Sequence, residues 1–281
     1  MQSSTSRSAD NQRAATVASH KQIIERVIEA MRTRLDEPLS LLDLAEVAMI
    51  SPFHFDRVFR HTVGLTPSQF LSALRIQAAK KLLLTTDLSV TDVCFEVGYN
   101  SLGTFITRFT QLVGVAPRRL RRLAEDLDRL NTALCNSCPS PPDLIPADGL
   151  IGQVTTVHPS EGPIMVGLFT TPIPQGLPIG CTLLTSPGRF QLGVVPDGQY
   201  YGFAAALESA GDAVPILIGE SQGLQVGIKG PLRVVDGQAA SEPEIVLRYA
   251  QPTDPPLLVS LPLLLHKNID HLTDPPKSNG R

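Results

Sequence analysis

The chain has 281 residues, of which 42% are hydrophobic, 18% are charged and none is Trp. These values exclude a fibrous or wholly disordered chain and indicate a folded protein long enough for two domains. The formal net charge of −3 gives no sign of a polyanionic partner, but the charge is unevenly distributed. Up to Leu134 the chain has 17 Lys and Arg against 14 Asp and Glu, and after it 7 against 13. Because 20 of the 24 Pro and 17 of the 21 Gly also follow Leu134, long helices are expected only before it.

The cysteine content and the polar N-terminus indicate the cellular compartment of the protein. Four scattered cysteines do not make a disulfide framework in a chain of this size, which favours a reducing cytoplasm. Residues 1–20 lack the apolar centre of a signal peptide. The longest apolar run, Leu257–Leu265, is about half as long as the ~20 residues that a membrane span needs. We therefore expect a cytoplasmic protein without a membrane partner.

The first half of the chain predicts helices. Residues 1–18 are polar and are expected to form a disordered arm. Apolar residues at helical spacing predict a first helix over Ile23–Leu35. Capping signals predict three more helices, over Ser40–Met49, Ser51–Thr62 and Thr66–Leu84.

An internal repeat covers the same region. Glu46–Pro67 recurs as Glu96–Pro117 at an offset of 50 residues, and each copy has two phenylalanines four residues apart. One alternative is a helical hairpin repeated for packing alone, but two copies are fewer than a solenoid needs. A helix-turn-helix unit places its second helix in the major groove of DNA. The intervening helix would be about 28 Å long, close to the ~34 Å of one DNA turn. The repeat thus predicts an all-α double helix-turn-helix domain over residues 19–130.

The second half predicts strands. Residues 131–150 have the composition of a Pro-rich linker. Short apolar stretches between Gly and Pro then predict a mainly-β domain over residues 151–268, an antiparallel sandwich or barrel, followed by a tail over 269–281. The predicted strands cover 153–157, 164–170, 182–185, 190–194, 200–207, 216–218, 224–228, 232–235, 245–249 and 257–261.

The repeat also carries a family resemblance. Residues 51–121 resemble the DNA-binding domain of the AraC/XylS family of bacterial transcription regulators. The resemblance is strongest over Ala78–Pro117, which contains the segment Glu96-Val97-Gly98-Tyr99. The resemblance covers about residues 20–124. It implies sequence-specific binding to double-stranded promoter DNA and control of transcription, with RNA polymerase as a further partner.

The resemblance also assigns roles in the first recognition helix. It places three side chains at positions that usually contact base edges: Phe53, Asp56 and Arg57. Arg57 is the strongest candidate because a guanidinium can bond guanine in a bidentate way. A phosphate contact is the alternative for Arg57. Three other residues of this helix are expected to contact the DNA backbone or to form a solvated face: His54, Arg60 and His61.

The second recognition helix, residues 101–112, departs from the family pattern. Many relatives have polar readers where this chain has Leu102, Gly103 and Thr107. Leu102 and Thr107 remain candidates for base contacts and Arg108 for a phosphate contact, so this helix is expected mainly to position the protein. A cluster at the start of the last helix predicts a phosphate-binding edge or, alternatively, a solvated face: Arg118, Arg119, Arg121 and Arg122.

The role of the β domain is left open by its sequence. Residues 188–201 predict a strand, a Pro-Asp-Gly turn and a strand, similar to a hairpin of transthyretin-like and carboxypeptidase-regulatory-like sandwiches. An effector site, a homodimer contact, a protein partner and a purely structural role are all considered. In an alternative for the whole chain, this domain is a ligand-binding or enzymatic unit that the helices recruit to DNA.

The sequence contains no strong signal of a catalytic or metal-binding group. Cys135 and Cys138 lack the further ligands of a zinc site, although a redox role in the linker is conceivable. The six histidines show no metal-binding spacing, and no catalytic motif is present. We therefore expect no enzyme activity, no cofactor and no metal.

Overall fold

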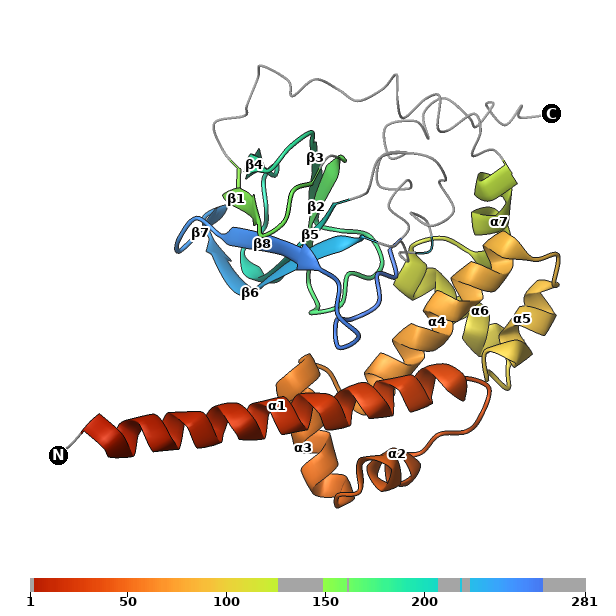
Figure 1. Cartoon of the computed structure of the whole chain (residues 1–281). Coiled ribbons are helices and arrows are strands. Elements are labelled where there is room, and N and C mark those ends of the chain that lie inside the picture. Colours follow the sequence, from red (N-terminus) through yellow and green to blue (C-terminus); the bar gives the residue numbers. More distant parts are fainter. Residues whose placement is uncertain (1–2, 126–148, 161, 207–217, 219–222, 260–281) are drawn as a thin grey trace.

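The computed structural model describes residues 3–125, 149–160, 162–206, 218 and 223–259 (Figure 1). Within these residues helices come first and strands follow, as the distribution of Pro and Gly predicts. Cys135, Cys138 and the predicted tail from residue 269 lie outside the described residues, as does the predicted linker up to residue 148.

The helical part contains the predicted pairs. Its helices are α1 (Ser3–Thr33), α2 (Leu41–Ala48), α3 (Pro52–Val63), α4 (Pro67–Thr85), α5 (Val90–Glu96), α6 (Leu102–Val113) and α7 (Pro117–Glu125). Reciprocal capping boxes begin α2, α4 and α5, at Ser40, Thr66 and Ser89. Because these caps satisfy the first free backbone N–H groups, α2 and α4 begin within a residue of their predicted starts.

The first helix differs from its prediction. It begins at Ser3, so the arm predicted as disordered over residues 1–18 is helical from Ser3 onward. The prediction relied on the lack of large apolar residues. No Gly or Pro precedes Pro38, so nothing in the backbone stops the α1 helix from extending in the N-terminal direction.

The helical core surrounds α4. Phe55 and Phe59 of α3 and Phe70 of α4 are fully buried, and their rings meet edge to face with centroids 5.6 and 5.7 Å apart. Phe105 and Phe109 of α6 are also fully buried, and their rings are tilted relative to each other with centroids 5.6 Å apart. The repeated phenylalanine pairs are therefore core residues, which leaves the opposite faces of α3 and α6 for contact with a partner.

The strands form a barrel-like sheet. They are β1 (Ile151–Thr156), β2 (Ile164–Phe169), β3 (Gly180–Leu184), β4 (Gly188–Gln191), β5 (Gly198–Ala206), β6 (Gln225–Val235), β7 (Gln238–Ala239) and β8 (Glu244–Tyr249). Their order is β3-β2-β5-β6-β8-β1-β4, and β7 pairs with β6. The end strands β3 and β4 follow each other in the chain and contact each other, so the sheet curls round an apolar interior. The predicted mainly-β second domain is confirmed.

Two features of strand pairing were predicted wrongly. The sheet is not antiparallel throughout, because β8 returns beside β1 in the parallel direction. The predicted hairpin over 188–201 does not form, since β4 pairs with β1 while β5 pairs with β2 and β6. Leu192 and Val195 between β4 and β5 are buried in the barrel core, so this segment crosses the barrel instead of turning tightly.

Further differences from the predicted strands occur at Gly and Pro positions. The strands predicted at 224–228 and 232–235 are one strand, β6. It continues through an irregularity in which Gly230 and Pro231 stand opposite the single residue Tyr201 of β5. The tight hairpin of this domain joins β6 to β7 through Asp236 and Gly237, both with positive φ, and its Asp-Gly signal was missed. Of the strand predicted at 216–218 only Ile218 is described, and it is helical.

The strand predicted at 257–261 is not a strand within its described part. We call residues 250–259, which follow β8, the joint segment. Leu257 and Leu258 direct their carbonyl oxygens to Nζ of the fully buried Lys80 on α4, at 3.1 and 3.0 Å. The N–H groups of Leu258 and Val259 donate to the carbonyl oxygen of Pro174. These contacts use the backbone groups that a sheet would need.

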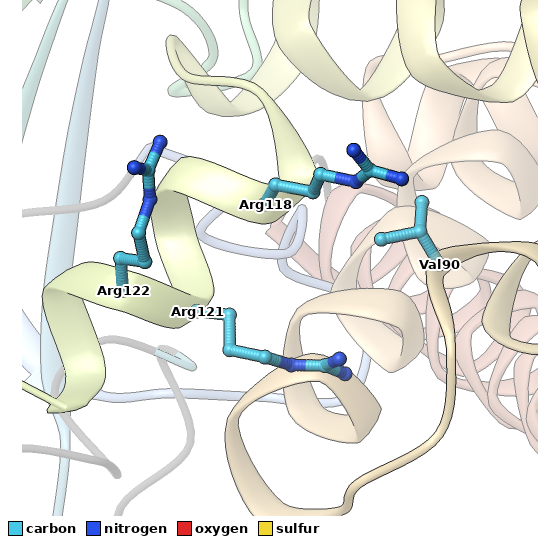
Figure 2. A pocket seen from close by; sticks show the side chains of 4 residues that line it. All are labelled: Val90, Arg118, Arg121 and Arg122. Carbon is cyan, nitrogen blue, oxygen red and sulfur yellow. The ribbon is translucent and has the colours of Figure 1, made fainter.

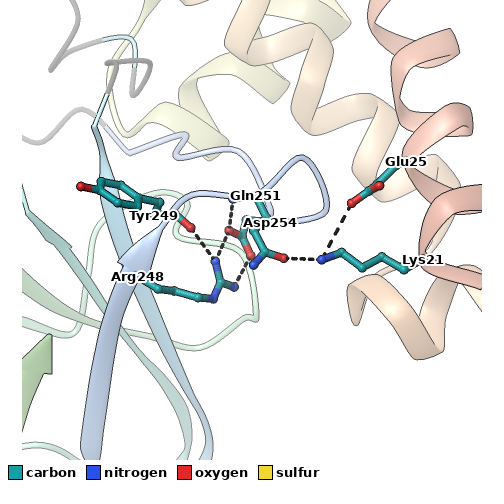
Figure 3. Close-up of polar contacts among 6 residues, drawn as sticks. All are labelled: Lys21, Glu25, Arg248, Tyr249, Gln251 and Asp254. Atoms are coloured by element: carbon teal, nitrogen blue, oxygen red, sulfur yellow. Dashed lines mark hydrogen bonds and ion pairs between the residues drawn. The ribbon is translucent and has the colours of Figure 1, made fainter. Parts of the chain in front are cut away.

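The joint segment connects the two domains. Leu258 and Ile173 complete the core of the helical domain although both belong to the β half of the chain. Figure 3 shows the polar side of this contact, where Arg248 holds Asp254 at 2.7 and 2.8 Å and Gln251 accepts from Nζ of Lys21 on α1 at 3.0 Å. The bond to Asp254 raises the pKa of Arg248. The two domains thus share core residues and a polar contact.

Candidate nucleic-acid interface

Two helix pairs form the candidate interface. In Figure 1 the pair α2 and α3 lies at one end of α4, and the pair α5 and α6 lies at the other end. The barrel lies on the other side of α1 from α2 and α3. Helix α4 has 19 residues, so it separates the pairs by about 28 Å along its axis.

Helix α3 carries six of the thirteen predicted contact residues. Phe53 is 81% exposed, which is unusual for an aromatic side chain in a folded domain. Arg57 is exposed and donates to Nδ1 of His54 at 3.1 Å. This bond orients the guanidinium along the helix and leaves its other N–H groups available. His61 is exposed at the end of the same helix.

Two of the predicted residues on α3 pair with each other. Nε of Arg60 donates to the carboxylate of Asp56 at 2.8 Å, one helical turn apart. An exposed pair of this kind contributes little to stability, about 0.3–0.5 kcal/mol. The pair does neutralise the one carboxylate on this face, which reduces its repulsion of DNA phosphates. The pair occupies Oδ2 of Asp56, so Oδ1 can still accept from a base while the pair is closed.

Helix α6 presents a different face. Leu102 is half-buried and packs against the helical core, while Thr107 and Arg108 are exposed. A Cβ placed at Gly103 would meet nothing within 4 Å, so the start of this helix is open to solvent. The exposed surface of α6 is therefore nearly uncharged, with Arg108 its one cationic side chain.

The arginines of α7 have different environments. Figure 2 shows Arg118, Arg121 and Arg122 around a cavity of about 400 Å³ beside Val90. The guanidinium of Arg121 donates to the carbonyl oxygens of Leu83 at 3.1 Å and Leu88 at 2.6 Å. Arg121 therefore bonds to the last turn of α4 and to the residues that follow it, and its role as a phosphate contact stays a prediction. Arg118, Arg119 and Arg122 remain exposed.

Arg75 has a related role that the sequence did not indicate. It is half-buried on α4 and donates to the carbonyl oxygens of Leu35 at 2.9 Å and Glu37 at 2.6 Å, beyond the end of α1. Burial lowers the pKa of Arg75 from its ordinary value. Gly98 lies close to the same carbonyl oxygen of Leu35, since a Cβ at residue 98 would lie only 2.4 Å from it. These contacts join distant residues, so no local signal reveals them.

The titratable groups with shifted pKa values near the interface belong to helix caps and to the core. Hydrogen bonds from Ser40 lower the pKa of Asp43 in the capping box of α2. Burial raises the pKa of the Cys94 thiol, which keeps it protonated at neutral pH. No group of His, Cys, Asp and Glu side chains in the described residues could hold a metal ion. Within the same residues, no helix has both the length and the apolarity to cross a membrane.

Comparison with known proteins places the helical part in a family. A helix-turn-helix domain family matches residues 44–123. The transcriptional activator AarP of Providencia stuartii is 32% identical over 99 residues, which are 35% of this chain and 73% of AarP. The chain belongs to the AraC/XylS family. The family resemblance stated from the sequence is therefore confirmed.

Other AraC/XylS relatives match the same part. The bifunctional transcriptional activator and DNA repair enzyme AdaA of Bacillus subtilis is 30% identical over 102 residues, or 36% of this chain and 48% of AdaA. A solved AraC-type regulator from Chromobacterium violaceum has 25% identity, covers 38% of this chain and 96% of its own, and has a TM-score of 0.37. This chain spans about half of AdaA and 37% of the melibiose operon regulatory protein of Escherichia coli. The barrel lies outside the family match.

Proposed function

We propose that the chain is a transcription regulator that binds double-stranded promoter DNA in a sequence-specific way. The observation that carries this proposal is the pairing of two helix-turn-helix units of the AraC/XylS family at the two ends of one helix, α4. A separation of about 28 Å approaches the ~34 Å between successive major grooves on one face of DNA. One chain thus presents two recognition helices without dimerising.

The two recognition helices have unequal roles in this proposal. In this proposal α3 contacts base edges through Phe53, Asp56 and Arg57. It contacts the DNA backbone through His54, Arg60 and His61. On α6, Leu102 and Thr107 make weaker base contacts and Arg108 contacts a phosphate. Three exposed arginines of α7 bind further phosphates: Arg118, Arg119 and Arg122. The charge of the first part of the chain is modest, so affinity depends on these arginines and less on bulk charge.

A regulator of transcription needs partners besides DNA. RNA polymerase is the partner through which such a regulator acts on transcription, and the barrel is available for an effector or for a second copy of the chain. The relatives that match are named as transcription regulators, which favours this function over a ligand-binding or enzymatic barrel that the helices recruit to DNA. The repair activity in the name of AdaA belongs to that protein.

The test uses the full chain, because Ile173 and Leu258 complete the helical core. Binding sites are selected from a random duplex library, and fluorescence anisotropy then compares the selected site with a shuffled duplex at several salt concentrations. We expect the selected site to bind about 10³-fold more tightly or better, with affinity that falls steeply with salt. Equal affinity for both duplexes would contradict the proposal.

A further inference from the structure

A histidine on α3 contacts the strongest candidate for a base contact, Arg57. Nη2 of Arg57 donates to Nδ1 of His54 at 3.1 Å, and the two residues are three positions apart on α3. His54 is half-buried, whereas Arg57 is exposed. Residues three positions apart lie on the same face of a helix, so the helix itself keeps the two side chains within reach of each other.

The imidazole of His54 also contacts α1. Its ring and the ring of His20 meet edge to face, with centroids 6.0 Å apart and ring planes at 71°. His20 is itself half-buried. A side chain that packs against a second helix has fewer rotamers available, so Nδ1 of His54 stays directed at Arg57 and acts as a fixed acceptor.

The chemistry of the two side chains determines where the hydrogen of His54 lies. A guanidinium only donates hydrogen bonds, so Nδ1 of His54 must be the acceptor. A neutral imidazole that accepts at Nδ1 carries its hydrogen on Nε2. His54 therefore keeps one N–H donor, with which it can make its proposed contact to the DNA backbone. Arg57 keeps its remaining N–H groups for a base.

Protonation of His54 would remove this bond. With hydrogens on both ring nitrogens an imidazolium only donates, and its charge would face the like charge of Arg57. Helices α1, α2 and α4 pack against α3, and from them the titratable side chain that faces His54 is His20 of α1. The nearest carboxylate along α3, that of Asp56, pairs with Arg60. Among the described residues no carboxylate bonds to His54, so none offsets the repulsion.

We propose that His54 is a positioning residue, which in its neutral form holds Arg57 in the orientation that reads guanine. The inference rests on the proposed function, because it assumes that α3 contacts base edges in the major groove. Protonated His54 releases Arg57 but gains a charge beside the DNA backbone. A fall in pH therefore lowers discrimination between sequences, while the affinity for duplexes in general is kept or raised.

The experiment uses the full chain and measures discrimination at the base pair that Arg57 reads. That base pair is the one at which Arg57→Ala changes the selected-site logo. Fluorescence anisotropy compares the selected duplex with a duplex that carries 7-deazaguanine there, which pairs normally but lacks the N7 acceptor. The ratio of the two dissociation constants is measured at about pH 8 and about pH 5.5, on either side of the range in which histidine ordinarily titrates.

We expect this ratio to fall about threefold or more at the lower pH, because one of the two bonds of a bidentate contact is no longer oriented. The affinity for a shuffled duplex should not fall over the same range, since protonation adds a cation to the interface. A loss of folded protein would lower both quantities together. The opposite directions therefore separate positioning from a structural role.

Four variants identify the titrating group. His54→Gln supplies an amide oxygen that can accept from Arg57 at any pH, so the ratio should stay high at both pH values. His54→Lys places a permanent cation there and should give a low ratio at both. His61→Gln is the matched control on the same helix. It can lower affinity for every duplex, but its ratio should still fall with pH. His20→Phe keeps an aromatic ring without a titratable group, and its ratio should also fall.

Three results would overturn the inference. They are a ratio that does not change with pH in the unchanged chain, an equal fall in His54→Gln, and a logo that Arg57→Ala leaves unchanged. If the selected duplex still binds more tightly than a shuffled one at the higher pH, each of these results leaves the proposed function standing. Equal affinity for the selected and shuffled duplexes at that pH would contradict the proposed function, and the inference with it.

Discussion

The two helix-turn-helix units share a frame and differ in what they expose. Each begins with a capping box at a serine, Ser40 in one unit and Ser89 in the other, and each buries a pair of phenylalanines from its second helix. On the exposed side, α3 carries an aromatic ring and several cationic side chains, whereas α6 carries small polar groups and Arg108. The comparison shows that the repeat preserves packing while the contact faces have different chemistry.

The turns of the two units also differ. In the first unit the left-handed position after α2 is occupied by Met49, with φ of 58°, and in the second the left-handed position after α5 is occupied by Gly98, with φ of 79°. Met49 is 82% exposed. Gly98 lies against the backbone beyond α1, where no side chain fits. The second turn is therefore constrained by close packing, and the first is not.

The largest effect that we expect comes from Gly98→Ala. The new Cβ would lie 2.4 Å from the Leu35 carbonyl oxygen at a positive φ, so we expect a loss of about 3 kcal/mol or more in the free energy of unfolding. Gly64→Ala is the matched control, because Gly64 has φ of 80° but nothing within 4 Å of its Cβ position. It should lose only about 1 kcal/mol. Urea unfolding followed by circular dichroism measures both, and equal losses would show that close packing is not the cause.

The next prediction tests the unequal reading by α3 and α6. Arg57→Ala should reduce discrimination at one or two base pairs by about 1–3 kcal/mol, because a bidentate contact to guanine is lost. Arg108→Ala should weaken all duplexes alike. Selected-site logos of the two variants and of the unchanged chain provide the measurement. If Arg57→Ala leaves the logo unchanged, α3 does not read bases through this residue.

The arginines of α7 give a smaller effect that separates DNA binding from stability. Arg118→Ala should lower affinity for every duplex by a similar factor and make the salt slope shallower by about 1, with no change in unfolding. Arg121→Ala should destabilise the fold by about 1–2 kcal/mol, because the carbonyl oxygens at the end of α4 lose a charged donor. Anisotropy and urea unfolding distinguish these outcomes. A stable Arg121→Ala variant with a shallower salt slope would instead support its predicted phosphate contact.

Sequence reasoning worked where the signal is local. Ser51-Pro52 and Thr66-Pro67 mark helix starts, and the repeat identifies both recognition helices and the length of α4. These features depend on residues within a few positions of one another, which is why they could be predicted. The Asp236-Gly237 turn is equally local and could have been found from its dipeptide.

The missed features all join residues that are distant in the chain. Arg75 and Arg121 reach carbonyl oxygens more than thirty residues away. A strand was predicted at 257–261 because these residues are apolar, but the carbonyl oxygens of Leu257 and Leu258 bond to Lys80. The parallel pairing of β1 with β8 also joins strands that are distant in the chain, so no local pattern predicts it.

The smallest effect concerns the first turn alone. Met49→Gly should raise the free energy of unfolding by about 0.5–1 kcal/mol, because glycine adopts a positive φ without steric cost and the exposed methionine contributes little packing. The greater freedom of glycine in the unfolded chain offsets part of this gain. Met49→Ala removes the side chain but keeps the backbone cost, so it should give no gain. An equal gain from both variants would trace the effect to the exposed side chain, and the two turns would then not differ in backbone strain.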